Sequence, residues 1–342
     1  MFANKLGWGV AALIALGGAL WYRSTVLSEP PVPEVHVAMV TGGPGPYWRL
    51  VASGARASAA ENNVDLDIQM PADEENVEEQ TKLLKALDLE ECDGIAVSPL
   101  DVAGQSPLID GIAEDVLVVT FDSDAPDTKR ISYIGTSNMQ AGRRAGRLVR
   151  EAIPQGGKVV VAIANLTKDN MIERRAGLDE VIRGASENVA APDATYEVLD
   201  YLVDEGDAER SRELVAKALD DNEDVACLVG LNAFHGPILL EVVKKADKQG
   251  KVAIIAFDEE AGTLAGVESG DIYATVAQDP YRYGYEAVKS LATLCRASEQ
   301  QRQLKGSFST FNISTITVTK DTVGEFRKQL EERSGEGAAA GK

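Results

Sequence analysis

The sequence is poor in histidine and in basic residues, and each shortage excludes a class of function. Its 342 residues include two histidines, His36 and His235, far apart in the chain. That argues against His-based catalysis or a multi-histidine metal site. Lys and Arg number 34 against 54 Asp and Glu, a formal net charge of −20. Such an acidic surface repels phosphate backbones, and no basic stripe offsets it, so we expect no nucleic-acid binding.

Cysteine is also scarce. Cys92, Cys227 and Cys295 lie far apart, show no CxxC spacing and are odd in number, so they form neither a disulfide framework nor a metal site. We expect free, buried thiols, because Cys227 lies in the apolar run Val225–Leu231 and Cys295 at a core-spaced helix position. Hydrophobic residues make up 44% and charged residues 26%. These ordinary values exclude a disordered or fibrous chain, and the length suggests about two domains.

Residues 1–33 are predicted to direct export. Leu6 to Tyr22 is an uncharged stretch of 17 residues, which as a helix would span ~26 Å, slightly short of a bilayer core. A positive start followed by a short apolar stretch is typical of a signal peptide. Trp21 and Tyr22 before Arg23 also suit a retained anchor at the membrane interface. Both alternatives place the rest of the chain in the periplasm or another extracytoplasmic space, tethered to the inner membrane in the second case. A Pro-rich spacer ends this segment.

From residue 34 the chain alternates apolar strands with amphipathic helices. Strands are predicted at Val35–Val40, Val64–Met70, Gly94–Val97, Val116–Phe121, Ile131–Gly135, Lys158–Ala164, Thr195–Val203, Val225–Leu231, Val252–Phe257 and Ile272–Ala277. This alternation predicts an α/β fold with parallel sheets covered on both faces. Two such blocks, with changeovers near 136 and 279, indicate two doubly wound parallel-sheet lobes. The Gly/Ala-rich tail, 333–342, is predicted to be disordered.

Catalytic and cofactor signatures are missing. The loop Gly43–Trp48 has Trp where a dinucleotide loop needs its third Gly, and the chain contains no GK[ST], HExxH or GxSxG motif. The acidic pair Asp122 and Asp124 lacks the Gly and the distal Glu of a calcium loop. We therefore predict no catalytic residue, no metal ligand set and no cofactor, and expect binding instead of turnover.

Polar and aromatic side chains follow the predicted strands at their carboxyl ends, where open α/β sheets bind ligands. They are Tyr47, Trp48, Asp122, Asn170, Arg174, Asn232, Asp258 and Gln278. Several have structural alternatives. Asn170, Asn232 and Asp258 stand where helix caps would, and Asp122 could fix a turn.

Arg174 is harder to explain structurally. It shares a helix face with Met171 and Leu178 and so points inward, where an arginine needs an acceptor such as a ligand hydroxyl or a carboxylate across the cleft.

Together these residue types suit a ligand that carries many hydroxyl groups. Carboxylates and amides bind vicinal hydroxyls in pairs, and Arg donates in a rigid fork. An aromatic ring such as that of Tyr47 or Trp48 can cover the apolar face of a sugar. Since each unsatisfied buried hydroxyl costs ~1–3 kcal/mol, a buried polyol requires a site of this composition.

Five segments together resemble the sugar-binding branch of type I periplasmic binding proteins, which includes ribose-, xylose- and galactose-binding receptors of ABC transporters. They are Val118–Asp124, Asn170–Gly177, Gly230–Asn232, Ile255–Asp258 and Ala274–Pro280. The resemblance runs from about Val35 to Val318. It implies two lobes joined by a three-segment hinge, with the ligand between them. The N-terminal lobe would comprise 34–135 and 279–311, and the C-terminal lobe 136–278 and 312–332.

The resemblance also implies roles for the site residues. By the resemblance, the positions that contact sugar hydroxyls are Asp122, Arg174, Asn232, Asp258 and Gln278, with Tyr47, Trp48 and Phe257 as aromatic contacts. Ser123 and Asn170 complete the predicted ligand-binding set. Ser123 stands where some relatives carry Arg, and Glu259 and Glu260 stand where small residues are commoner. The implied partners are a small sugar and the subunits of an ABC permease, and the soluble part would be monomeric.

Three other functions are alternatives to a transport receptor. A membrane-anchored sensor subunit would bind a sugar or autoinducer and signal without feeding a transporter. A LacI-type regulator would need a basic helix-turn-helix before the first strand, where this chain has its export segment. A glycosidase would use an acidic pair for catalysis.

Overall fold

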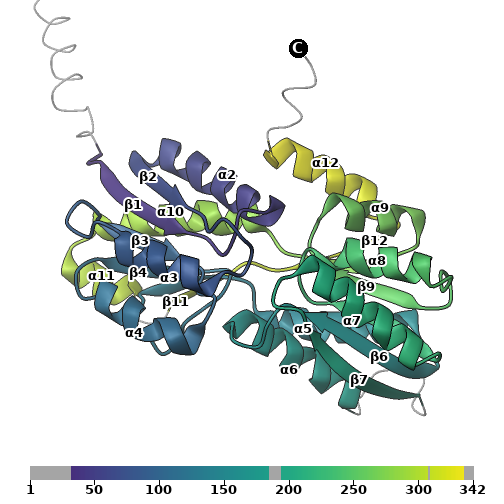
Figure 1. Ribbon diagram of the computed structural model, residues 1–342. Coiled ribbons are helices and arrows are strands. Elements are labelled where there is room, and N and C mark those ends of the chain that lie inside the picture. The colour runs from purple at the N-terminus through teal and green to yellow at the C-terminus, as the bar shows by residue number, and fades with distance from the viewer. Residues whose placement is uncertain (1–31, 185–193, 307–308, 335–342) are drawn as a thin grey trace, which may run out of the picture. The chain divides into compact units, whose positions relative to one another are not determined.

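Two six-stranded sheets organise the chain from Val35 onward (Figure 1). The computed structural model describes residues 32–184, 194–306 and 309–334. Residues 1–31, which hold most of the predicted export segment, lie outside the described residues. Among the residues described, no helix combines the length and apolar character that crossing a membrane requires.

The first sheet has the strand order β11-β5-β4-β3-β1-β2, and all neighbouring strands are parallel. Its strands are β1 (Val35–Val40), β2 (Val64–Gln69), β3 (Gly94–Val97), β4 (Leu117–Phe121), β5 (Ser132–Gly135) and β11 (Ser309–Asn312). Val37 and Met39 pack on one face with α2 (Pro46–Glu61) and α10 (Pro280–Cys295). Ala38 and Val40 pack on the other face with α3 (Val77–Ala86) and α4 (Val102–Ile112). Successive side chains of a strand point to opposite faces, so a continuous apolar run fills both cores.

The second sheet repeats this plan with the order β12-β10-β9-β8-β6-β7. Its strands are β6 (Gly156–Ile163), β7 (Thr195–Val203), β8 (Val225–Gly230), β9 (Ala253–Phe257), β10 (Ala274–Ala277) and β12 (Ile316–Thr319). Only β12 runs antiparallel to its neighbour among the strand pairs described. One face packs on α5 (Asn138–Ala152) and α6 (Asp169–Arg183). The other packs on α7 (Ala208–Asp221), α8 (His235–Lys245), α9 (Ala261–Ser269) and α12 (Val323–Ser334).

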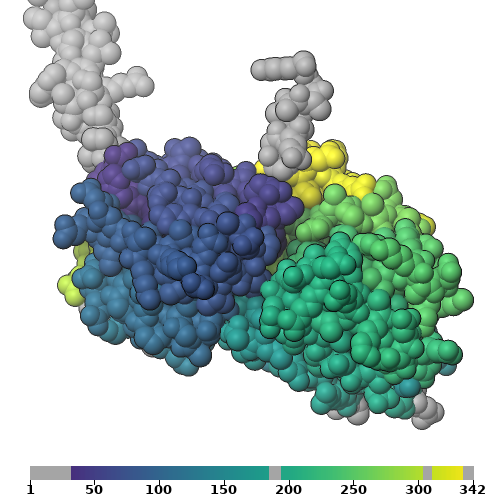
Figure 2. Space-filling view, in the orientation of Figure 1, coloured from purple at the N-terminus to yellow at the C-terminus, as the bar shows by residue number. Residues whose placement is uncertain are grey.

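The first sheet with α2, α3, α4 and α10 is here called the first lobe, and the second sheet with α5 to α9 and α12 the second lobe. The chain passes between the sheets three times, after β5, after β10 and between β11 and β12. The predicted fold class, two doubly wound parallel-sheet lobes with three connections, is confirmed. On the face seen in Figure 2, the blue first lobe and the green second lobe meet along one boundary.

The structure also contains elements that the sequence patterns did not predict. Strands β11 and β12 have four residues each, too few for a clear alternation. Helix α4 contains Gly104 and Pro107, which normally discourage a helix, and α11 (Glu299–Gly306) is a short polar helix. Helix α12 extends to Ser334, so the predicted tail begins with two helical residues. Cys227 is buried, whereas Cys295, expected in the core, is only partly buried.

Candidate ligand-binding site

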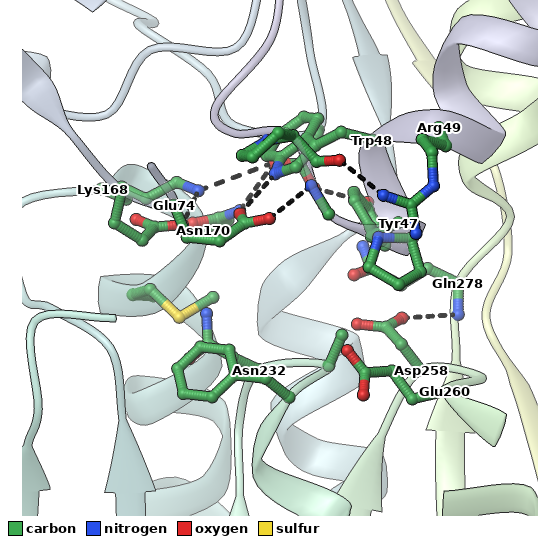
Figure 3. A pocket seen from close by; sticks show the side chains of 18 of the residues that line it. Tyr47, Trp48, Arg49, Glu74, Lys168, Asn170, Asn232, Asp258, Glu260 and Gln278 are labelled. Carbon is green, nitrogen blue, oxygen red and sulfur yellow. Dashed lines mark hydrogen bonds and ion pairs between the residues drawn. The ribbon is translucent and has the colours of Figure 1, made fainter. Parts of the chain in front are cut away.

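The carboxyl ends of strands from both sheets border one cavity of about 450 Å³ (Figure 3). Eight of the predicted site residues line it: Tyr47, Trp48, Asp122, Asn170, Arg174, Asn232, Asp258 and Gln278. The first three belong to the first lobe and the other five to the second. Parallel strands collect polar groups at one edge of each sheet. Because both edges border this cavity, side chains more than two hundred positions apart in the sequence come together there.

Ser123 and Phe257 do not line this cavity. Both are fully buried. The backbone N–H of Ser123 donates to Ser98 Oγ at 3.4 Å. The ring of Phe257 lies beneath Arg174, whose guanidinium carbon is 4.7 Å from the ring centroid. Phe257 therefore supports an arginine that lines the cavity and does not itself face the space.

The helix-cap alternatives for three predicted residues are wrong. Asn170 is the second residue of α6, and its Nδ2 donates to Asp122 Oδ2 across the cavity at 3.3 Å. Asn232 Oδ1 accepts from the backbone N–H of Ala164 at 3.0 Å. Asp258 Oδ1 accepts from the backbone N–H of Gln278 at 3.1 Å. Asn170 thus ties α6 to the end of β4, and Asn232 and Asp258 each tie a loop to a neighbouring strand end, while the helices that follow Asn232 and Asp258 begin without a side-chain cap.

Asp122 is the centre of the hydrogen-bond network in the first lobe. Its Oδ1 accepts from the Tyr47 hydroxyl at 2.7 Å, and its Oδ2 accepts from Ser98 Oγ at 3.0 Å. Its side chain therefore holds an aromatic residue of the cavity wall instead of fixing its own turn. Asp122 and Asp258 both have a left-handed backbone, with φ of 59° and 61°.

Arg174 finds its acceptors inside the protein. Its Nε donates to Asn138 Oδ1 at 2.9 Å and its Nη1 to the Leu231 carbonyl at 2.8 Å, while Nη2 donates to Gln278 Oε1. From the sequence we expected the acceptor to be a ligand hydroxyl or a carboxylate across the cleft. These three acceptors all belong to the second lobe, so the guanidinium is already oriented before a ligand binds. Less side-chain entropy is then lost on binding.

Glu74 is a cavity residue that the sequence argument missed. Its Oε2 accepts from Trp48 Nε1 at 2.9 Å and its Oε1 from the backbone N–H of Gly45 at 2.6 Å. The glycine-rich loop makes this approach possible, since a Cβ at Gly45 would lie 2.1 Å from Glu74 Oε1. Glu74 follows β2, so the same search of strand ends would have found it had that strand been included.

Lys168 and Glu75 were missed as well, and they join the two lobes. Lys168 Nζ lies 3.1 Å from Glu75 Oε1, and both side chains are nearly buried. Glu75 Oε2 accepts from Asn165 Nδ2 at 2.7 Å, and Lys168 Nζ is 5.6 Å from the Trp48 ring centroid. These contacts close one side of the cavity.

Burial raises the pKa of three cavity carboxyls. The pKa of Asp258 is raised to about 7, chiefly because the group is desolvated, and Asp122 and Glu260 raise it further while Arg174 and the Gln278 N–H oppose the change. The pKa values of Glu74 and Glu260 are also raised by burial. Within the described residues no group of His, Cys, Asp and Glu side chains could hold a metal ion. The site offers hydrogen-bond acceptors, an arginine fork and aromatic walls.

A family model described as "Periplasmic binding protein domain" matches residues 36–299. The chain belongs to the periplasmic binding protein family. Two curated relatives of this binding protein come from Escherichia coli (strain K12). The D-allose-binding periplasmic protein is 23% identical over 255 residues, covering 71% of this chain and 79% of the relative. The ribose import binding protein RbsB is 23% identical over 296 residues, covering 84% and 94%.

Solved structures agree with the type I fold of this periplasmic binding protein. GanP, a glucose-galactose binding protein from Geobacillus stearothermophilus, is 29% identical with a TM-score of 0.76, covering 84% of this chain and 98% of GanP. AraP, an arabinose binding protein from the same organism, is 28% identical with a TM-score of 0.70, covering 86% and 99%. These relatives are binding proteins, which agrees with the prediction of a non-catalytic site.

Proposed function

We propose that this protein is an exported receptor that binds a small sugar in the cavity between its lobes and delivers it to an ABC-type permease. One observation carries the proposal. Asp122 from the first lobe and Asn170, Arg174 and Asp258 from the second line one cavity and leave their polar atoms beside it. A hydroxyl-rich ligand needs acceptors and donors from several directions at once. The names of the relatives, which bind ribose, allose, arabinose, glucose or galactose, point to the same ligand class.

Within this proposal the carboxylates of Asp122 and Asp258 accept from sugar hydroxyls, and Arg174, Asn232 and Gln278 donate to ring and hydroxyl oxygens. Asn170 Oδ1 supports this arrangement, because it is buried without a hydrogen-bond partner and stands at the cavity. A sugar hydroxyl would donate to it. Tyr47 supplies an aromatic wall, half-buried and held in place by Asp122.

The lobes would open about their three connections and close on the sugar. The Glu75–Lys168 ion pair and the bond between Asn170 and Asp122 each join one lobe to the other. Such contacts exist only when the lobes are close, so they would add to the affinity of the closed state.

A thermal-shift panel of monosaccharides, polyols and nucleosides tests the proposed function. A ligand at a hundredfold excess over its Kd stabilises the folded state by ~2.7 kcal/mol, which raises Tm measurably. We expect one or more sugars to raise Tm, and calorimetry to show weaker binding to Asp122→Ala by about 2–5 kcal/mol. Asp110→Ala, at a carboxylate of the first lobe outside the cavity, is the control. Absence of any sugar response would refute the proposal, and co-purification with a kinase instead of a permease would refute the delivery step.

A further inference from the structure

A second compartment adjoins the sugar cavity. It has a volume of about 480 Å³ and shares six lining residues with the cavity: Pro46, Tyr47, Arg49, Ala233, Asp258 and Glu260. Beyond this shared wall it is bordered by Glu259 and by residues of three helices: Leu50 and Ser53 of α2, Ala261 and Gly262 of α9, and Leu330 and Glu331 of α12. Because six residues border both spaces, the two lie next to each other, which is the arrangement that a ligand reaching into both requires.

The size of the two spaces points to a ligand longer than one sugar ring. Pockets that bury small ligands typically measure about 300–1,000 Å³. The first cavity alone, at about 450 Å³, already lies in this range, and the site residues described above surround it. A monosaccharide in the cavity would leave the second compartment to a substituent of the sugar.

The chemistry of the second compartment is acidic. Asp258, Glu259 and Glu260 line it. Glu259 is almost fully buried, and its Oε2 has no hydrogen-bond partner. No residue that the structure describes donates a hydrogen bond to the Glu260 carboxylate, and Figure 3 shows this carboxylate beside that of Asp258 at the cavity.

The one cation at this wall is oriented by its own loop. Arg49 Nη1 donates to the Pro44 carbonyl at 2.8 Å. Among the described residues that line both spaces, Arg49 is the one Lys or Arg. A buried carboxyl oxygen without a donor is unfavourable, and it favours a ligand that brings one.

We infer that the ligand is a glycoside whose sugar ring lies in the first cavity and whose substituent carries an amino group into the second compartment, beside Glu259 and Glu260. This inference rests on the proposed function, since it extends the same site. An ammonium group would donate to carboxylate oxygens that the protein leaves unpaired, and an anionic substituent would be repelled by them.

The test compares derivatives of whichever monosaccharide raises Tm most in the panel. The free sugar, its methyl glycoside, its 2-aminoethyl glycoside and its 2-carboxyethyl glycoside are titrated calorimetrically into the full chain. We expect the 2-aminoethyl glycoside to bind at least about tenfold tighter than the methyl glycoside, which corresponds to about 1.4 kcal/mol. We expect the 2-carboxyethyl glycoside to bind more weakly than the methyl glycoside.

Two substitutions on one helix locate the effect. Ala261 and Ala265 are both exposed on α9, but only Ala261 lines the second compartment. Ala261→Trp should remove the tenfold gain of the 2-aminoethyl glycoside and leave the free sugar within about twofold of its affinity. Ala265→Trp should change neither. Ser53→Trp fills the compartment from α2 and replaces Ala261→Trp if that variant unfolds at a lower temperature.

Three results overturn the inference. The first is equal affinity for the 2-aminoethyl and methyl glycosides, and the second is a gain that survives both Ala261→Trp and Ser53→Trp. The third is binding of the free sugar with exclusion of all glycosides. Each of these results is compatible with sugar binding. If the chain binds no sugar in any form, both the proposed function and this inference are refuted.

Discussion

Asp122 and Asp258 occupy equivalent places in the two lobes. Each follows a strand, β4 or β9, and each has a left-handed backbone with φ near 60°. The N–H of Asp122 donates to the Ile134 carbonyl and that of Asp258 to the Val276 carbonyl, both at 3.0 Å. Aspartate tolerates this conformation better than most residues. The turn it makes directs one carboxylate from each lobe toward the same cavity.

Asp258→Asn should remove a pH dependence from the stability of the ligand-free protein. The folded-state pKa of Asp258, about 7, lies above the ordinary value of 3.8, so the folded state holds a proton that the unfolded state has lost. Stability from this group is therefore complete below about pH 4 and declines as pH rises to about 7. The difference corresponds to about 4 kcal/mol at most.

Thermal unfolding measured from pH 4 to pH 8 checks this. The slope of Tm against pH over that range should be shallower for Asp258→Asn than for the parent. Asp224→Asn, at an exposed ion pair whose carboxyl pKa is lowered, is the control. Identical slopes for the parent and Asp258→Asn would mean that Asp258 is ionised throughout.

Arg174→Met should destabilise the fold as well as the site. The substitution leaves the acceptors of Asn138, Leu231 and Gln278 without their donor in a buried position. Each buried neutral acceptor left without a donor typically costs about 1–3 kcal/mol, so we expect a loss of about 3 kcal/mol or more. Urea unfolding at 25 °C measures the change. Arg183→Met, on the same helix with its side chain 65% exposed, should cost less than about 1 kcal/mol, and equal stabilities for the two variants would contradict the structure.

Trp48 should report ligand binding by its fluorescence. Its indole Nε1 donates to Glu74, and Lys168 of the other lobe lies beside its ring. Opening or closing of the lobes changes this charged surrounding. The sequence has two other tryptophans, Trp8 and Trp21, which are replaced by Phe for the measurement. Sugar titration should then change the emission with the Kd found by calorimetry, and a signal that persists in Trp48→Phe would show that the change arises elsewhere.

Glu75 and Lys168 should be energetically coupled in ligand binding. Their ion pair joins the two lobes, with side chains 9% and 3% exposed. If closure forms this pair, Glu75→Gln and Lys168→Met each weaken sugar binding. The double-mutant cycle should then give a coupling of about 1 kcal/mol or more. The exposed pair Glu114–Lys129 within the first lobe should give a coupling near zero, and a similar value for both pairs would argue against a role in closure.

The sequence by itself determined the fold class and most of the candidate site. Continuous apolar strands such as Val35–Val40 are buried on both faces only in a covered parallel sheet, so two parallel-sheet lobes follow from local patterns. Parallel strands end at one edge, which predicts that Arg174 and Asp258 gather at the edge of the second sheet. The resemblance to two-lobed binding proteins implied that Asp122 of the first sheet faces them.

Only the tertiary structure decided what each side chain contacts. The sequence around Asn170 is the same whether the amide caps its helix or reaches Asp122, and packing between the lobes selects the second. The Glu75–Lys168 pair, 93 residues apart, left no local signal, because an ion pair across two lobes depends on how the sheets are placed. The second compartment lies between α2, α9 and α12. Its volume depends on how these three helices are placed, which the sequence pattern of a single helix does not predict.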